Sequence, residues 1–273
     1  MPFLKKYFRS FALRFLLLDE YKRLNCRNKR LLKQIFRYPG RAEYPISLLH
    51  FFKTTDEVLL IDVGANVGNF ANAFKQTFPN THIIAFEPAT DNFNELSKKF
   101  SKDPTVNLHR CAISNEEKML PLYLQGECSE QNTLEFHPKG AYGDYDTQHE
   151  KHEFVSCKTL DSFNIQKGNR KLCLKVDVEG HDIEVFEGAK TLLNEADVVI
   201  VEANFINMHL DSQGKRKPPS FSKLVTLCEA VGLYPIIFHI FGDEISNYAF
   251  RRDVIFVKEA LLDNVLFFKK FSY

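Results

Sequence analysis

The sequence predicts an α/β fold, in which a mostly parallel sheet carries helices on both faces. Three observations support it: short apolar runs alternate with segments of helical periodicity, the first run ends in a glycine-rich turn, and acidic residues follow several runs. Residues 56–273 contain no internal repeat and no linker. We therefore expect one α/β domain there, preceded by a basic helical extension over residues 1–55.

The N-terminal extension is defined by its charge. The first 41 residues carry 12 Lys and Arg against two acidic residues, whereas the rest of the chain is mildly acidic. Apolar residues at helical spacing predict an amphipathic helix over residues 3–18, which would either pack on its own domain as a lid or contact a membrane surface. The sequence contains no membrane-spanning stretch and no signal-peptide cleavage site, which predicts a cytoplasmic protein, with peripheral membrane contact through residues 1–18 as the alternative. No nucleic-acid partner is expected, because no recognised binding module accompanies the charge.

Residues 58–68 are the most informative stretch. The apolar run Val58–Ile61 predicts a buried strand, and a glycine-bracketed turn leads from it into a helix beginning at Val67. The carboxylate that ends the strand would repel a pyrophosphate, so the turn differs from a dinucleotide site. It suits a cationic ligand without phosphate, and S-adenosylmethionine carries an ammonium and a sulfonium group. The alternative is a purely structural turn. The predicted cofactor-binding residues here are Asp62, Gly64, Ala65, Asn66 and Gly68.

The second and third predicted strands add a ribose and an adenine contact. His82–Phe86 forms the second strand, and Glu87 ends it beside the first strand, where a carboxylate can accept both ribose hydroxyls. A helix follows over 91–100. Val106–Ile113 is expected to be the third strand, with Ala112 and Ile113 at the adenine edge of the site.

A polar segment separates the two halves of the domain. Residues 119–124 and 154–158 predict extra strands, possible partners in a hairpin, and the loop 125–153 between them has the character of a lid or binding loop. His149 and His152 lie in this loop, but such residues are common in solvated loops, so no metal site is predicted. The six cysteines are scattered and imply neither a zinc site nor a disulfide framework.

The second half of the domain brings further carboxylates to the sheet edge. Leu172–Val176 predicts the fourth core strand, which runs into Asp177 and then one helix through Leu193. A fifth strand over 198–201 ends in Glu202, and a loop over 204–219 follows. A helix over 220–231 and strands over 234–240 and 253–257 complete the sheet.

Three motifs together carry a family resemblance: Asp62-Val-Gly-Ala-Asn-Val-Gly68, Phe86-Glu-Pro88 and Leu174-Lys-Val-Asp-Val-Glu-Gly-His181. Over residues 56–258 the chain resembles the FkbM family, S-adenosylmethionine-dependent methyltransferases of the Rossmann-like class I. The resemblance implies a seven-stranded sheet and O-methylation of a hydroxyl on a sugar, glycan or secondary metabolite. The family's Asn-Thr-Leu element appears at 132–134, but Ser129-Glu130-Gln131 precedes it where the family has a glycine-rich lead-in.

Methyl transfer to an alcohol requires a base to remove a proton. The predicted catalytic residues are Asp177, His181 and Glu202, with Asp177 and His181 expected to reach one pocket across the strand–helix turn. In the alternative interpretation, Asp177 binds the cofactor and His181 caps the helix. Two alternatives for the whole chain are a non-catalytic binding or scaffold protein on this fold, and a membrane-peripheral enzyme acting on a lipid-linked glycan.

Overall fold

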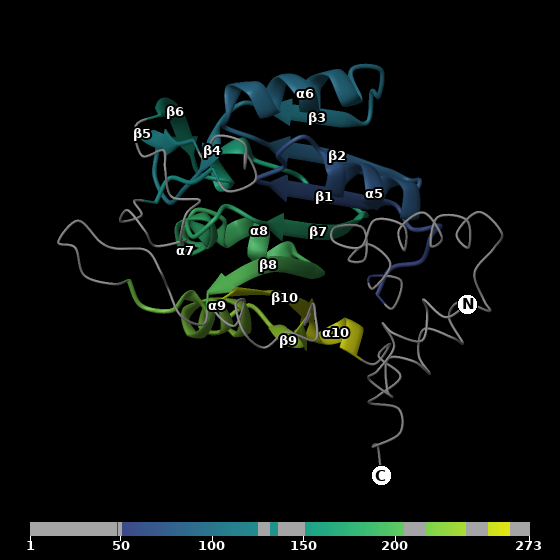
Figure 1. Cartoon of the computed structure of the whole chain (residues 1–273). Coiled ribbons are helices and arrows are strands. Elements are labelled where there is room, and N and C mark those ends of the chain that lie inside the picture. Colours follow the sequence, from purple (N-terminus) through teal and green to yellow (C-terminus); the bar gives the residue numbers. More distant parts are fainter. Residues whose placement is uncertain are drawn as a thin grey trace, which may run out of the picture.

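The computed structural model describes residue 48 and residues 51–124, 132–135, 151–204, 217–238 and 251–262. They form a seven-stranded sheet in the order β3-β2-β1-β7-β8-β10-β9, which confirms the predicted α/β fold class (Figure 1). The strands are β1 (Val58–Val63), β2 (Thr81–Phe86), β3 (Val106–His109), β7 (Lys171–Val176), β8 (Val198–Asn204), β9 (Leu233–Phe238) and β10 (Arg251–Lys258). Most of the predicted N-terminal extension, including its helix over 3–18, lies outside the described residues.

The centre of the sheet is parallel and places several strand ends at one edge. β1 pairs in parallel with β2 on one side and with β7 on the other, and β7 pairs in parallel with β8. Only β10 runs antiparallel among these strands, between β8 and β9. The chain order reverses at β1, and ligands of open α/β sheets bind at such a reversal, beyond the carboxyl ends of the strands.

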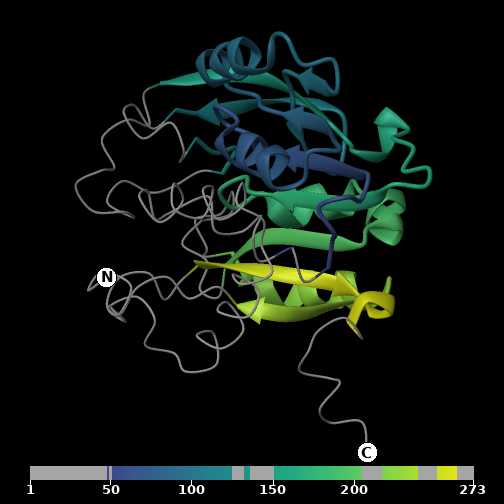
Figure 2. The same ribbon diagram turned by 90° about the vertical axis from the view of Figure 1, so that its right-hand side faces the viewer.

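Helices cover both faces of the sheet (Figure 2). α5 (Asn69–Thr77) and α6 (Thr90–Phe100) pack their apolar side chains on one face. α7 (Asp182–Glu187), α8 (Lys190–Glu195) and α9 (Ser220–Glu229) pack on the other, and a short α10 (Glu259–Leu262) follows β10. Because both faces are covered, every residue of β1 is buried, as its continuous apolar run predicts.

The structure corrects two predicted elements. The third strand is broken at Arg110 and Cys111: β3 joins the main sheet, whereas β4 (Ala112–Ile113) joins a smaller sheet in the order β4-β6-β5. The helix after β7 is interrupted between α7 and α8, where Gly188 lies so close to the Ser114 backbone that a Cβ would be 2.1 Å from its carbonyl oxygen. Tertiary contact with β4 thus ends a helix that the apolar spacing alone would continue.

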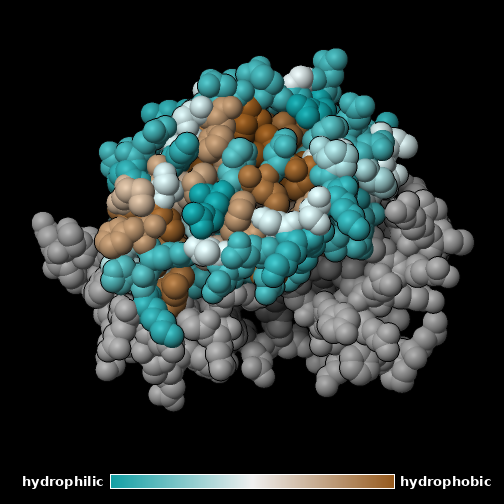
Figure 3. Space-filling model, turned by 90° about the horizontal axis from the view of Figure 1, so that it is seen from above, coloured by the Kyte–Doolittle hydropathy of each residue, from teal (hydrophilic) through white to brown (hydrophobic). Residues whose placement is uncertain are grey.

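The smaller sheet forms one side of the molecule. β5 (Lys118–Tyr123) and β6 (His152–Lys158) form the expected antiparallel pair, and their inner residues pack with Ala89 and Ala112. Met119 and Phe154 stay 59% and 66% exposed on the outer side. Seen from the α6 side, the described surface is mainly hydrophilic, with apolar side chains gathered in limited areas (Figure 3). Within the described residues, no helix is both long and apolar enough to cross a bilayer.

Candidate active site

A cavity of about 250 Å³ lies at the carboxyl ends of β1, β2, β7 and β8. Its wall takes residues from the turn after β1, from β4, from the segment 132–135 and from the turn after β7. Five of its described lining residues are acidic and one is a lysine: Glu87, Asp177, Glu179, Glu202, Asp253 and Lys175. A cavity with this excess of carboxylates is suited to a cationic or hydroxyl-rich ligand and not to a pyrophosphate.

The turn after β1 requires glycine at two places. Gly64 has φ +77°, and a Cβ there would lie 1.9 Å from the carbonyl oxygen of Asp177. Gly68 has φ +76° and precedes the first residue of α5, and a Cβ there would lie 2.6 Å from the side chain of Leu96. The backbone N–H groups of Gly64 and Ala65 donate to the carbonyl of Phe86, each over 3.0 Å. Glycine thus lets the turn approach the neighbouring strands closely.

Asp62, predicted to end the first strand, lies inside β1 and does not line the cavity. Asp62 is completely buried, and the Nζ of Lys175, its neighbour across the β1–β7 pair, lies 3.2 Å from its Oδ1. The same Nζ lies 3.3 Å from Oδ2 of Asp177 and donates to the carbonyl of Gly64 over 3.2 Å. Burial acts to lower the pKa of Lys175, but the two carboxylates outweigh burial and raise it. The cation that Asp62 attracts is therefore the chain's own lysine.

Lys175 was not among the residues predicted from the sequence. The sequence did contain a sign of its role, because Lys175 is a charged residue within a mainly apolar strand. The pairing of β1 with β7 then places it opposite Asp62. Its ammonium forms ion pairs with Asp62 and Asp177 and donates a hydrogen bond to the carbonyl of Gly64, so the side chain ties the turns after β1 and β7 together.

Glu87 ends β2 and does line the cavity. Its Oε2 accepts the backbone N–H of Asn66 over 2.8 Å, and its Oε1 accepts that of Ala89 over 3.0 Å. Asn66 itself has φ +51°. Burial raises the pKa of Glu87 to about 7, although these N–H groups, a hydrogen bond from Asn92 and the ammonium of Lys175 oppose the rise. The predicted strand-end acid is therefore held rigidly at the wall of the cavity.

The predicted adenine edge also lies in the wall. Ala112 and Ile113 line the cavity from β4 and are 5% and 2% exposed. Cys111 precedes them in the wall, and burial raises the pKa of its thiol to about 11. Asn132 and Leu134 complete this part of the wall, whereas residues 125–131 and 136–150 of the predicted loop 125–153 lie outside the described residues.

Carboxylates converge at the other end of the cavity. Oxygens of Asp177, Glu179 and Glu202 lie within 4.8 Å of one another. Asp177 directly follows β7, as the sequence predicts, and Glu179 has φ +53° in the same turn. Glu202 lies inside β8, which continues two residues past the predicted end of the strand, to Asn204. Glu179 and Asp253 were not predicted as site residues. Glu179 lies in an irregular turn, and Asp253 lies in a strand that was predicted only as part of the sheet.

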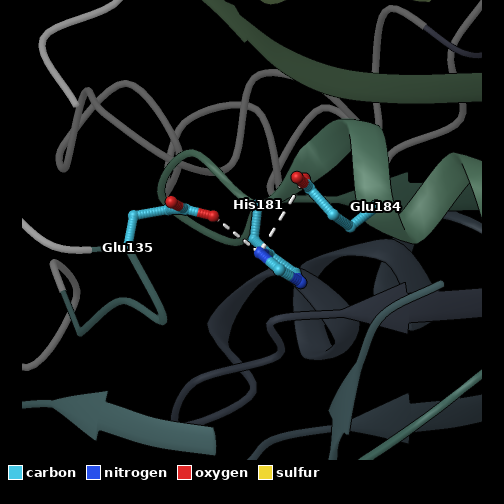
Figure 4. Close-up of side chains that lie close together, drawn as sticks. All are labelled: Glu135, His181 and Glu184. Carbon is cyan, nitrogen blue, oxygen red and sulfur yellow. Dashed lines mark hydrogen bonds and ion pairs between the residues drawn. The ribbon is translucent and has the colours of Figure 1, made fainter. Parts of the chain in front are cut away.

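His181 lies beside the cavity and is not part of its lining. It is 5% exposed, its Nδ1 lies 2.7 Å from Oε1 of Glu135, and its Nε2 lies 2.9 Å from Oγ of Ser114 (Figure 4). It precedes α7 but makes no side-chain cap. The expectation that Asp177 and His181 reach one pocket differs from the structure, because the turn after β7 carries the histidine towards β4.

Comparisons with known proteins agree with this architecture. Residues 62–230 match the methyltransferase FkbM domain. A 146-residue stretch, 49% of this chain, is 30% identical to a "Methyltransferase 1" of Beauveria bassiana. A 192-residue stretch, 68% of this chain, is 27% identical to the hexuronic acid methyltransferase AglP of Haloferax volcanii.

These alignments do not cover the relatives completely. The chain spans 59% of the Beauveria protein and 71% of the Haloferax protein. A solved structure of a methyltransferase FkbM from Methylobacillus flagellatus overlaps with 75% of this chain and 44% of that one, at 12% identity and a TM-score of 0.47.

Proposed function

The chain belongs to the methyltransferase FkbM family, and from this premise we propose that it transfers a methyl group from S-adenosylmethionine to a hydroxyl of a sugar, glycan or secondary metabolite. The observation that carries the proposal is the composition of the cavity wall, which contains five acidic residues and one lysine. The turn after β1 also lies so close to the backbone of Asp177 that no side chain fits at Gly64. S-adenosylmethionine supplies an electrophilic methyl group on a sulfonium, and its two positive centres suit this wall.

Each part of the cofactor can be assigned to residues along the wall. Glu87 would accept a ribose hydroxyl, because it lines the cavity and its three donors, the N–H groups of Asn66 and Ala89 and the Asn92 side chain, leave about one of its four lone-pair sites open. Ala112 and Ile113 would flank the adenine, and the turn 64–68 would hold the methionine part. Asp62 would act from behind the wall, by fixing Lys175 between the two turns.

The acceptor would bind at the carboxylate end of the cavity. A carboxylate can accept a hydrogen bond from an alcohol and remove its proton during transfer, which contributes about 10²–10⁴-fold in rate. We propose Asp177 as this base, with Glu202 as the second candidate, because both line the cavity. We do not assign the base role to His181, since both of its ring nitrogens are engaged outside the cavity.

Thermal unfolding with S-adenosylhomocysteine tests the cofactor assignment. A ligand at 100 times its dissociation constant stabilises the folded state by about 2.7 kcal/mol, which raises the Tm of a domain of this size by roughly 5–10 °C. No shift at millimolar ligand would contradict the cofactor assignment.

Transfer of labelled methyl groups to a panel of neutral sugars and glycans tests the activity. Once an acceptor is found, Asp177→Asn should lower kcat by about 10²–10⁴-fold while leaving S-adenosylhomocysteine binding within a few fold. Binding without transfer to any acceptor would favour a scaffold protein on the same fold. An Asp177→Asn variant with full kcat would exclude Asp177 as the base.

A further inference from the structure

Four polar side chains next to the cavity form a continuous hydrogen-bonded network, and three of them, Ser114, Glu135 and His181, are buried. Ser114 Oγ lies 2.9 Å from His181 Nε2, His181 Nδ1 lies 2.7 Å from Glu135 Oε1, and Glu135 Oε2 accepts from Lys217 Nζ over 2.5 Å. Figure 4 shows His181 between Glu135 and Glu184, with dashed lines from one ring nitrogen to an oxygen of each carboxylate. The members come from four parts of the chain far apart in sequence, so the contacts tie those parts together.

This hydrogen-bonded network resembles a hydrolase triad and a metal site, and its contacts argue against both. A serine, a histidine and a carboxylate in this order also form hydrolase triads, but Ser114 is completely buried and no substrate reaches it. Glu135, His181 and Glu184 are also close enough to hold a metal ion. The ammonium of Lys217, bonded to Glu135 and 3.9 Å from Glu184, already supplies the positive charge there.

The hydrogen-bonded network holds the segment 132–135 in place. Asn132 and Leu134 of this segment line the cavity, and Leu134 packs against the cluster that contains Ala112. At one end the segment is fixed by Thr133, which exchanges backbone hydrogen bonds of 2.8 and 3.2 Å with Tyr123. Its hydroxyl also donates to the carbonyl of Glu179 over 2.7 Å. At the other end the segment is fixed through Glu135.

The hydrogen bonds of Glu135 are strengthened by the burial and the charge of its carboxylate. The carboxylate is 7% exposed, so losing its partners would leave a buried charge, which is costly. Burial acts to raise the pKa of Glu135, but His181 and Lys217 outweigh it and lower the pKa to about 2, so the group is ionised at neutral pH. Charge-assisted hydrogen bonds of this kind are roughly twice as strong as neutral ones.

We propose that Glu135, His181 and Lys217 are positioning residues: they hold Asn132 and Leu134 in the wall of the cavity and so set the affinity for the cofactor. The proposal rests on the proposed function, because it takes S-adenosylmethionine as the ligand of the cavity. It also gives His181 a role without proton transfer. If the wall is formed in only a tenth of the molecules, the apparent affinity falls about tenfold.

Calorimetric titration of S-adenosylhomocysteine into the whole protein tests the proposal. Lys217→Met is the main variant, because its side chain is a quarter exposed and its loss should leave the fold intact. It should raise the Kd about tenfold, and Lys217→Arg should restore most of the affinity. Glu135→Gln should act in the same direction. Lys223→Met is the matched control, since it removes an ion pair of 2.6 Å with Glu187 that lies away from the cavity wall.

The outcomes separate this proposal from the proposed function. If the wild type does not bind S-adenosylhomocysteine, the cofactor assignment fails, and with it the ligand named here. If the wild type binds and a folded Lys217→Met binds equally well, the positioning role is wrong while the cofactor assignment stands. A Lys223→Met variant that loses as much affinity as Lys217→Met would also overturn the proposal. The loss of affinity would then follow from removing an ion pair away from the cavity wall, and would not be specific to Lys217. Should Glu135→Gln unfold, Lys217→Met and its arginine rescue decide the matter.

Discussion

Replacing Glu87 with glutamine should remove a specific pH dependence from the stability of the ligand-free protein. In the folded state burial raises the pKa of Glu87 to about 7 from an ordinary 4.5. Between these two values the unfolded chain has already released the proton and the folded chain still holds it. Stability from this group is therefore complete below about pH 4.5 and is lost as the pH rises through 7.

The size of the effect follows from the two pKa values. The full difference corresponds to about 3 kcal/mol, of which about 2.5 kcal/mol falls between pH 5 and pH 8. Glu87→Gln cannot titrate. It also loses an acceptor for the N–H of Asn66 or of Ala89, because one end of the amide is a donor. That loss should lower stability by an amount that does not depend on pH.

Urea unfolding of both proteins across this pH range gives the measurement. The advantage of the wild type over Glu87→Gln should shrink by about 2.5 kcal/mol from pH 5 to pH 8. Other buried acids, including Asp62 and Asp182, are common to both proteins and cancel in the difference. A difference that stays constant within about 0.5 kcal/mol would refute the burial argument for Glu87.

Two further substitutions test the construction of the cavity wall. Gly64→Ala should destabilise the protein by about 2 kcal/mol or more in urea unfolding and abolish S-adenosylhomocysteine binding, because it combines a positive φ with a Cβ placed 1.9 Å from a carbonyl oxygen. Gly168→Ala is its control, since that residue also has a positive φ but open space around it, and it should cost only about 1 kcal/mol. Lys175→Met should cost about 3–5 kcal/mol by leaving Asp62 buried without a counter-charge, and adding Asp62→Asn should recover much of the loss. A single Lys175→Met variant as stable as the wild type would show that the ion pair contributes nothing.

The fold was predictable because its elements are marked locally. The central parallel strands β1, β7 and β8 are short, mainly apolar runs buried on both faces, and the glycines and acids near their ends stand in fixed places relative to those runs. The sequence did not predict the strand and helix bounds that depend on tertiary contacts. The interruption between α7 and α8 depends on the close approach of Gly188 to the backbone of Ser114, which follows β4. The break after β3 depends on the pairing of β4 with β6 in the smaller sheet.

The site was predictable to the level of strand ends, but not of side-chain direction. Glu87 and Asp177 follow their strands, Glu202 lies near the end of β8, and all three line the cavity. Asp62 was predicted to end its strand in the same way, yet it lies inside β1, is completely buried and is paired with Lys175. His181 is turned away too, because its partners Ser114 and Glu135 lie in segments that no local pattern connects to it.

A consequence of the thiol in the cavity wall concerns self-damage. An enzyme that stores an electrophilic methyl donor exposes its own nucleophiles to alkylation, and a thiolate is the most reactive of these. At neutral pH a thiol with a pKa of about 11 is ionised in roughly one molecule in ten thousand. Cys111 therefore offers the donor an apolar surface and almost no competing acceptor. The burial that shapes this wall also protects it from the reagent that it would hold.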